Sequence, residues 1–153
     1  MRLLILLPLF LLGCTDAGEE TSQNAVSGPL ISETGRLENK NLDEASGLAA
    51  SQRAADLFWS INDDGPAVVY ALNPAGQHLG KVEILDAKNR DWEDIASFSL
   101  DGVAYLAIAD IGDNGSKHKH LSLYVVEEPD PEQDDVEVAW QIDFVYPLSL
   151  IHI

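Results

Sequence analysis

The sequence predicts an all-β fold, and three observations lead to this prediction. Between residues 42 and 146, short apolar runs rich in Val, Ile, Tyr, Phe and Trp alternate with turn sequences such as DDGP, NPAG and LDG. After the first fourteen residues, no segment carries an apolar stripe with a period of 3.6 over three helical turns. The hydrophobic content of 46% is ordinary for a globular core, and a length of 153 residues suits one domain.

The expected strands fall into two groups of four. In the first group they span residues 46–51, 57–62, 68–72 and 78–85. In the second group they span residues 94–100, 103–109, 121–127 and 136–146. Turn-forming residues such as Gly, Pro, Asn and Asp separate the runs, which favours short connections between neighbouring strands.

The four strand sequences of the first group resemble the four of the second group, taken in the same order. LDEASGLAAS aligns with RDWEDIASFS, matching Glu44 with Glu93, and LFWSINDDG aligns with AYLAIADIG, matching Asp63 with Asp110, 47 residues later. VVYALNP then aligns with SLYVVEEP, and GKVEI with WQIDF. Four strands in a period of about 40–50 residues are typical of a β-propeller blade. We therefore expect two four-stranded antiparallel blades of an incomplete β-propeller. An antiparallel sandwich of unrelated strands stays open as the alternative.

Four motifs carry a resemblance to known proteins. EASGL, W-x-x-ND, DWEDIA and DIGDN together resemble a pattern in exported bacterial β-propellers of the six-bladed type, including phytase-like and NHL-like domains. The resemblance covers about two thirds of the chain and implies about four further blades. Residues 37–147 would then be a partial propeller, and its two blades would leave sheet edges exposed.

The N-terminus is typical of an export signal. In MRLLILLPLFLLGC, Arg2 precedes an apolar run over residues 3–12, which is too short to span a bilayer. LLGC resembles a bacterial lipobox, which implies lipidation of Cys14, the only cysteine of the chain. An ordinary signal peptide that contains a cysteine is the alternative. Residues 15–36 lack periodicity and are expected to form a flexible tether.

These features predict a lipid-anchored protein of the cell envelope. Thr15 after the cysteine resembles the signal for outer-membrane sorting in Gram-negative bacteria, so the protein would face the periplasm or the exterior. Its partners would be the membrane, through the N-terminal lipid, and a ligand or protein that the sequence does not identify. With one cysteine, no intramolecular disulfide can form.

The C-terminal hexapeptide LSLIHI, residues 148–153, has a different character. It resembles the translation of a transposon end used as an adapter in sequencing libraries. We expect it to be a non-native read-through tail and the natural chain to continue beyond about Pro147. A natural strand end is the alternative.

The formal net charge of −17 limits the possible partners. Such a charge repels nucleic acids and anionic lipid head groups, and it favours cations or basic partners. We therefore exclude nucleic-acid binding.

The acidic residues predict a cation site. In a propeller, the segments that lead into the innermost strands and the loops after the second strands gather at one end of the channel. Carboxylates of successive blades would meet there and repel each other unless a cation compensates them. Oxygen ligands without paired histidines or cysteines favour calcium over zinc. The candidate ligands are Glu44, Asn62, Asp63, Glu93, Asp94, Asp110, Asp113 and Asn114. A plain turn-forming role is the alternative for each, because Asp and Asn favour turns.

Three specific kinds of site are unsupported. An EF-hand loop starting at Asp110 would place Gly112 and Leu121 at ligand positions. Ser46 in EASGL lacks the G-x-S-x-G elbow of a serine hydrolase, and GDNGSK has the wrong spacing for a phosphate-binding loop.

Two functions remain. The first is a propeller scaffold that binds a ligand or protein, with a calcium site. The alternative is a calcium-dependent hydrolase of phosphoesters or lactones, in which the ion lowers the pKa of a bound water and Glu93 or Asp110 is the general base. Because the chain has only nine Lys and Arg residues to hold a phosphate, the binding scaffold is favoured.

The three tryptophans are expected in different places. Trp59 and Trp140 occur in strand-like segments and are predicted to fill the space between blades. Trp92, between two acidic residues, could instead line the mouth of the channel.

Overall fold

The computed structural model describes residues 32–115 and 118–145. The chain divides into two units, Met1–Ser32 and Glu33–Ile153, and the architecture below is that of the second unit. Its described residues form eight strands and no helix, so the all-β prediction is confirmed. In the stretch described, no helix could cross a membrane. The expected signal peptide, Cys14, most of the tether and the C-terminal hexapeptide lie outside the described residues.

All eight expected strands are present, with ends within two residues of their predicted positions. The first four are β1 (Ala45–Ala50), β2 (Phe58–Asn62), β3 (Val68–Leu72) and β4 (His78–Leu85). The last four are β5 (Trp92–Leu100), β6 (Val103–Asp110), β7 (Leu121–Glu127) and β8 (Asp135–Phe144).

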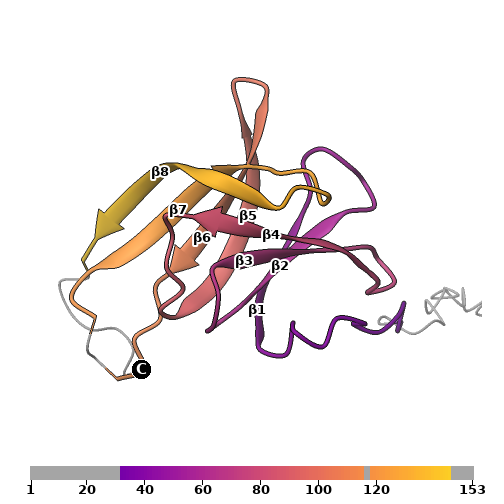
Figure 1. Cartoon of the computed structure of the whole chain (residues 1–153), viewed down its shortest axis with the longest axis horizontal. Helices are drawn as coiled ribbons and strands as arrows, with labels where there is room; N and C mark the ends of the chain where they lie inside the picture. Colours follow the sequence, from indigo (N-terminus) through magenta and orange to yellow (C-terminus); the bar gives the residue numbers. More distant parts are fainter. Residues whose placement is uncertain (1–31, 116–117, 146–153) are drawn as a thin grey trace, which may run out of the picture. The chain divides into compact units, whose positions relative to one another are not determined.

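The strands form one sheet in the order β1-β2-β3-β4-β8-β7-β6-β5 (Figure 1). The strands β1–β4, called the first module here, form an antiparallel meander, and β5–β8, the second module, form another. A short parallel pairing joins them, from Glu83↔Asp135 to Leu85↔Glu137. The structure therefore joins the two groups of four strands into a single, nearly closed sheet, where the sequence predicted two separate blades.

At the other edge, β1 and β5 lie together without a backbone ladder. The Ser46 hydroxyl donates to the carbonyl of Trp92 at 2.6 Å, and the Ser97 hydroxyl donates to the carbonyl of Ala50. A Cβ atom at Gly47 would lie 2.7 Å from the backbone nitrogen of Ile95, so only glycine allows this approach. These contacts bring the first strands of the two modules side by side.

The main hydrophobic core lies between the modules. Each module has a front face and a back face, and the front of the first packs against the back of the second. The front face of the first module contributes Ala49, Trp59, Ile61, Val69, Ala71, Val82 and Ile84. The back face of the second module contributes Ile95, Leu106, Ile108, Tyr124 and Val126. Burial of these apolar side chains is the main stabilisation that holds the modules together.

A segment that precedes β1 covers part of the back face of the first module. Leu42 packs there against a second cluster of Phe58, Val68, Tyr70 and Leu72. The backbone N–H of Glu38 donates to the carbonyl of Gly76 at 3.0 Å, and the Thr34 hydroxyl donates to the carbonyl of Pro74 at 3.0 Å.

The two modules repeat the same register. Tyr70 of β3 pairs with Ser60 of β2, and Tyr124 of β7 pairs with Ile108 of β6 in the corresponding place. Each module also has a bulge or irregularity in its first strand and another between its third and fourth strands, at matching positions. Because bulges are specific local features, their coincidence identifies the modules as structural repeats.

The register corrects part of the alignment made from sequence. Ala45 pairs with Asn62 in the first module and Trp92 pairs with Asp110 in the second, so Asn62, rather than Asp63, corresponds to Asp110. By the same register Ser46, rather than Glu44, corresponds to Glu93. The sequence alignment matched like carboxylates, whereas the apolar side chains that face the core set the pairing.

The tryptophans differ from expectation in two cases. Trp59 is fully buried between the modules, as predicted, but Trp92 is also fully buried and does not line an opening. Trp140 is 36% exposed on the front face of the second module.

Candidate metal centre

The end of β2 holds the segment before β1 in place. The Asn62 side chain accepts the backbone N–H of Glu44 at 3.3 Å and donates to the carbonyl of Asn41 at 2.7 Å and to Asp43 Oδ1 at 3.4 Å. The backbone N–H of Asp63 donates to the carbonyl of Glu44 at 3.0 Å. Asn62 is therefore a structural link, and both of its amide functions are used by the protein.

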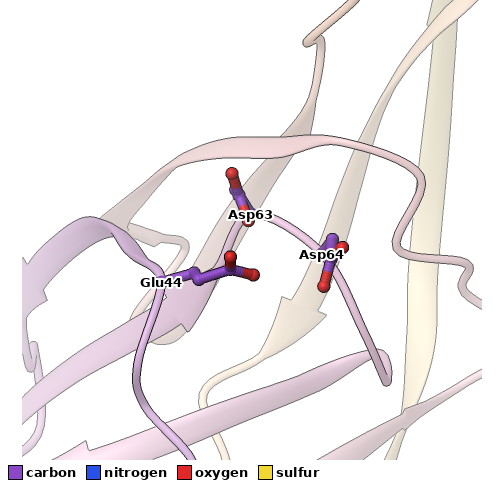
Figure 2. Close-up of side chains that lie close together, drawn as sticks. All are labelled: Glu44, Asp63 and Asp64. Atoms are coloured by element: carbon purple, nitrogen blue, oxygen red, sulfur yellow. The ribbon is translucent and has the colours of Figure 1, made fainter.

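These bonds bring three carboxylates together. One oxygen each of Glu44, Asp63 and Asp64 lies within 4.8 Å of the others. Figure 2 shows Glu44 reaching from the segment before β1 towards Asp63 and Asp64, which follow β2. We call this cluster the acidic triad. Asp64 was not among the predicted ligands, although its position next to Asp63 in SINDDG was a usable signal.

The carboxylates of the triad repel one another. The pKa of Glu44 is raised from its ordinary value of 4.5, chiefly by repulsion from Asp63 and then from Asp64. The pKa of Glu93 in the second module is also raised, first by burial and then by repulsion from Asp91 and Asp63. Asp63 therefore repels a carboxylate of each module, and a bond from the backbone N–H of Trp92 to its carbonyl, at 2.8 Å, holds it between them.

Asp63 also carries a buried polar atom that is unsatisfied. Its Oδ1 has no hydrogen-bond partner among the described residues. A buried oxygen of this kind typically costs about 1–3 kcal/mol when it is left unpaired. A cation held by the triad would satisfy it, and three carboxylate oxygens are the ligands of a hard ion such as calcium. The residues present therefore fit the expected ion at this position.

The corresponding place in the second module is occupied differently. Asp110, which is 1% exposed, accepts the backbone N–H of Asp91 at 3.1 Å and the Arg90 Nε at 2.6 Å. Arg90 also donates to the carbonyl of His120 at 3.1 Å. Arg90 balances the charge of Asp110, which is not among the three carboxylates of the triad.

The other predicted ligands are also used locally or lie elsewhere. Asp94 Oδ1 accepts the backbone N–H of Ile95 at 2.8 Å, and buried Asp113 accepts the backbone N–H of His118 at 3.0 Å. Asn114 is exposed in a turn. Among the described residues, the triad is the one cluster of three acidic, histidine or cysteine side chains with a spacing suited to an ion.

A polar pocket adjoins the triad. It has a volume of about 360 Å³, and Glu44, Asp64, Tyr70, Lys40 and Lys81 contribute to its lining. Burial, followed by repulsion from Asp43, raises the pKa of the Tyr70 hydroxyl, so this group remains protonated and able to donate a hydrogen bond. The pocket thus combines acidic, basic and hydroxyl groups in its lining.

Comparison of the sequence with protein-family models and with curated proteins finds no match.

Proposed function

We propose that this chain is a binding protein of the cell envelope, in which two blade-like modules form a rigid scaffold around a calcium site. The observation that carries the proposal is the buried, unsatisfied Oδ1 of Asp63 between Glu44 and Asp64. A bound cation would remove both the repulsion and the unsatisfied atom.

Three features support reading the modules as blades of a propeller. Each is a four-stranded antiparallel meander with matching register. The front of one packs on the back of the next, as in successive blades around an axis. The first strands lie side by side, and the last strands run parallel. Two modules related in this way bring the ends of their second strands to the same region, where the triad lies.

The pocket beside the triad supports a binding role. Glu44 and Asp64 belong both to the triad and to the lining of the pocket. A cation in the triad would place positive charge beside the pocket, and Lys81 in the pocket lining adds a second positive charge. We therefore expect a small polar ligand with oxygen atoms that contact the ion.

The anchoring part of the proposal depends on the sequence. Lipidation at Cys14, followed by the segment 15–36, would hold the scaffold at the membrane surface, in a Gram-negative bacterium at the outer membrane. This arrangement suits capture of a ligand in the envelope.

The hydrolase alternative has less support. Of its two candidate bases, Asp110 is buried and paired with Arg90. The pKa of Glu93 is raised, but burial and repulsion from Asp91 and Asp63 account for this shift. No observation favours bond cleavage over binding.

Calorimetric titration with calcium tests the proposal. We expect the protein to bind one ion, and Asp63→Asn to weaken binding by about tenfold or more, because it removes one charged ligand. Asp56→Asn is the matched control, since Asp56 lies before β2 and Asp63 directly after it. Equal heat from the Asp63→Asn variant and the unmodified protein, or no heat from either, would refute the calcium site.

A further inference from the structure

Asn114 and Gly115 form a turn in which both residues are exposed to solvent. The turn lies in the connection between β6 and β7. Asparagine is chemically labile because the backbone nitrogen of the next residue can attack its side-chain amide. Glycine as the next residue has no Cβ atom to hinder this attack. Whether the attack can occur in the folded protein depends on the hydrogen bonds and the exposure of the two residues.

The structure leaves both reacting groups of this pair free. Among the described residues, neither the side-chain amide of Asn114 nor the backbone N–H of Gly115 has a hydrogen-bond partner. In four other asparagines, the amide nitrogen is held by a hydrogen bond: Asn39, Asn62, Asn73 and Asn89. Loss of the amide nitrogen would break a bond at each of those positions, whereas at Asn114 it breaks none.

Asn41 separates the effect of a free amide from the effect of the following residue. Its side chain is exposed and also has no hydrogen-bond partner in the part of the chain that the structure describes. The next residue, however, is Leu42, which is 5% exposed and packed in the second cluster. A branched, buried side chain hinders the attack that Gly115 permits. Of the asparagines in residues 32–115 and 118–145, Asn114 alone combines a free amide with a following glycine.

The exposure of Asn114 does not require an uncovered module face. In the first module, the corresponding connection is residues 63–67, and the second module packs against the front face beside it. The middle residues of that connection are nevertheless exposed: Asp64, Gly65 and Pro66. A module against the front of the second module would leave the turn at Asn114 open in the same way.

We propose that Asn114 is a site of spontaneous deamidation in the folded protein, with water as the co-reactant. The backbone nitrogen of Gly115 loses its proton and attacks Asn114 Cγ. The new C–N bond replaces the bond from Cγ to Nδ2, which takes up a proton and leaves as ammonia. Water then opens the resulting cyclic imide. Cleavage of the bond between the Gly115 nitrogen and Cγ gives aspartate, and cleavage of its bond to the backbone carbonyl carbon gives isoaspartate.

The modification adds one negative charge to a chain whose formal net charge is −17. The new carboxylate follows Asp113, a buried side chain that already accepts the backbone N–H of His118 at 3.0 Å. We expect the modified protein to separate from the unmodified protein on anion exchange. The inference does not depend on the calcium site, because Asn114 lies outside the triad.

Incubation of the freshly purified full chain in water labelled with heavy oxygen tests the proposal. The protein is then digested with trypsin in ordinary water and measured by mass spectrometry. Trypsin cuts after Arg90 and Lys117, and the peptide 91–117 contains Asn114 as its only asparagine and no glutamine. We expect this peptide to gain heavy oxygen in two isomeric forms, which distinguishes deamidation of the folded protein from deamidation during digestion. The peptides 41–53 and 54–81, with Asn41, Asn62 and Asn73, should stay unlabelled.

Variants show whether the local chemistry is responsible. Asn114→Gln and Gly115→Val should each lose the label in peptide 91–117 over the same incubation, because a longer side chain or a branched neighbour disfavours ring closure. Asn41→Gln is the matched control and should be labelled like the unmodified protein. Asp63→Asn should also leave this label unchanged, so failure of the calcium proposal and failure of this inference are distinguishable.

Three results would overturn the inference. The first is an unlabelled peptide 91–117 from the folded protein together with a labelled one from protein unfolded in urea, which would show that the turn blocks the attack. The second is equal labelling of all peptides that contain asparagine. The third is full labelling of Gly115→Val with an unchanged circular dichroism spectrum, which would show that the glycine is not needed.

Discussion

The carboxylate of Glu128 ties the second module to the first. Although it is only 2% exposed, it accepts hydrogen bonds from the hydroxyl of Ser51, the backbone N–H of Gln52 at 2.9 Å and the Trp59 Nε1 at 3.0 Å. Arg53 donates to the backbone carbonyl of Glu128 at 2.9 Å. A single side chain therefore accepts hydrogen bonds from three donors of residues 51–59, of which the Trp59 Nε1 lies in the core.

We expect Glu128→Ala to lower the free energy of unfolding by about 3 kcal/mol or more, because three donors lose their acceptor. Urea denaturation measures the change. Glu127→Ala, at the exposed neighbouring position, is the matched control and should stay within about 0.5 kcal/mol of the unmodified protein. Equal stability of the two variants would show that the bonds to Glu128 contribute little.

Glu127 and Glu128 also show where prediction from sequence ends. The two residues are identical and adjacent, and nothing local distinguishes the exposed carboxylate from the buried one. The difference arises from Ser51 and Trp59, which are more than sixty positions away in the chain. A long-range partner of this kind leaves no periodic signal in the sequence.

At the scale of the element, each module links the end of its second strand to the segment before its first strand by a side-chain hydrogen bond. The side-chain donor and acceptor are exchanged between the two modules. At the end of β2, Asn62 donates to Asp43 and accepts the backbone N–H of Glu44. At the end of β6, Asp110 accepts from Arg90 and from the backbone N–H of Asp91. The side-chain donor is thus Asn62, on the strand, in the first module and Arg90, on the segment before the first strand, in the second.

This exchange of donor and acceptor can be tested by giving the second module the residue pair of the first. We expect Arg90→Asp alone to destabilise the protein by about 3–5 kcal/mol, because it places a second carboxylate against buried Asp110. Adding Asp110→Asn recreates the pair of the first module and should restore most of that loss. Chemical denaturation of both single variants and of the double variant gives the coupling. Purely additive losses would show that the two pairs are not equivalent.

The strands were predictable because apolar side chains mark them locally. The runs around Val69 and Val125 are β-branched and bounded by turn residues, and both are strands at the expected positions. Pairing across the modules was not predictable. The parallel contact between Leu85 and Glu137, and the approach at Gly47, depend on how complete modules stack. For the same reason the sequence identified Glu44 and Asp63 but also named Asp110, whose pairing with Arg90 depends on the fold.

At the scale of the whole molecule, stacking of the modules concentrates negative charge. Glu44 precedes the first strand of one module, and Glu93 lies in the first strand of the other, yet Asp63 repels both. The two first strands lie side by side, so these carboxylates meet although they are distant in the chain. The repulsion of Glu44 by Asp63 and Asp64 lies within the first module, and stacking adds the repulsion between Asp63 and Glu93 of the second.

The raised pKa of Glu44 determines how this repulsion affects stability as the pH changes. The folded protein binds the proton of this group more tightly than the unfolded chain, so its favourable contribution is fully present below the ordinary value of 4.5 and is lost as the pH rises through the folded-state pKa. We expect Glu44→Gln to gain stability relative to the unmodified protein over that rise, in the absence of calcium. Asp143 provides an internal control of opposite sign. Hydrogen bonds from Ser122 and Gln141 lower its pKa from 3.8, so its contribution is present above that value and is lost as the pH falls through the lowered pKa.

Thermal unfolding from pH 3 to pH 8, with and without calcium, measures both effects. Without calcium, the melting temperature of Glu44→Gln should exceed that of the unmodified protein increasingly as the pH rises above about 4.5. Asp143→Asn should instead fall below the unmodified protein at neutral pH. Calcium should reverse the Glu44→Gln advantage, because a ligand of the folded state stabilises the form that keeps the full triad. A Glu44→Gln difference that is constant with pH would mean that Asp63 and Asp64 do not repel Glu44 in the folded protein.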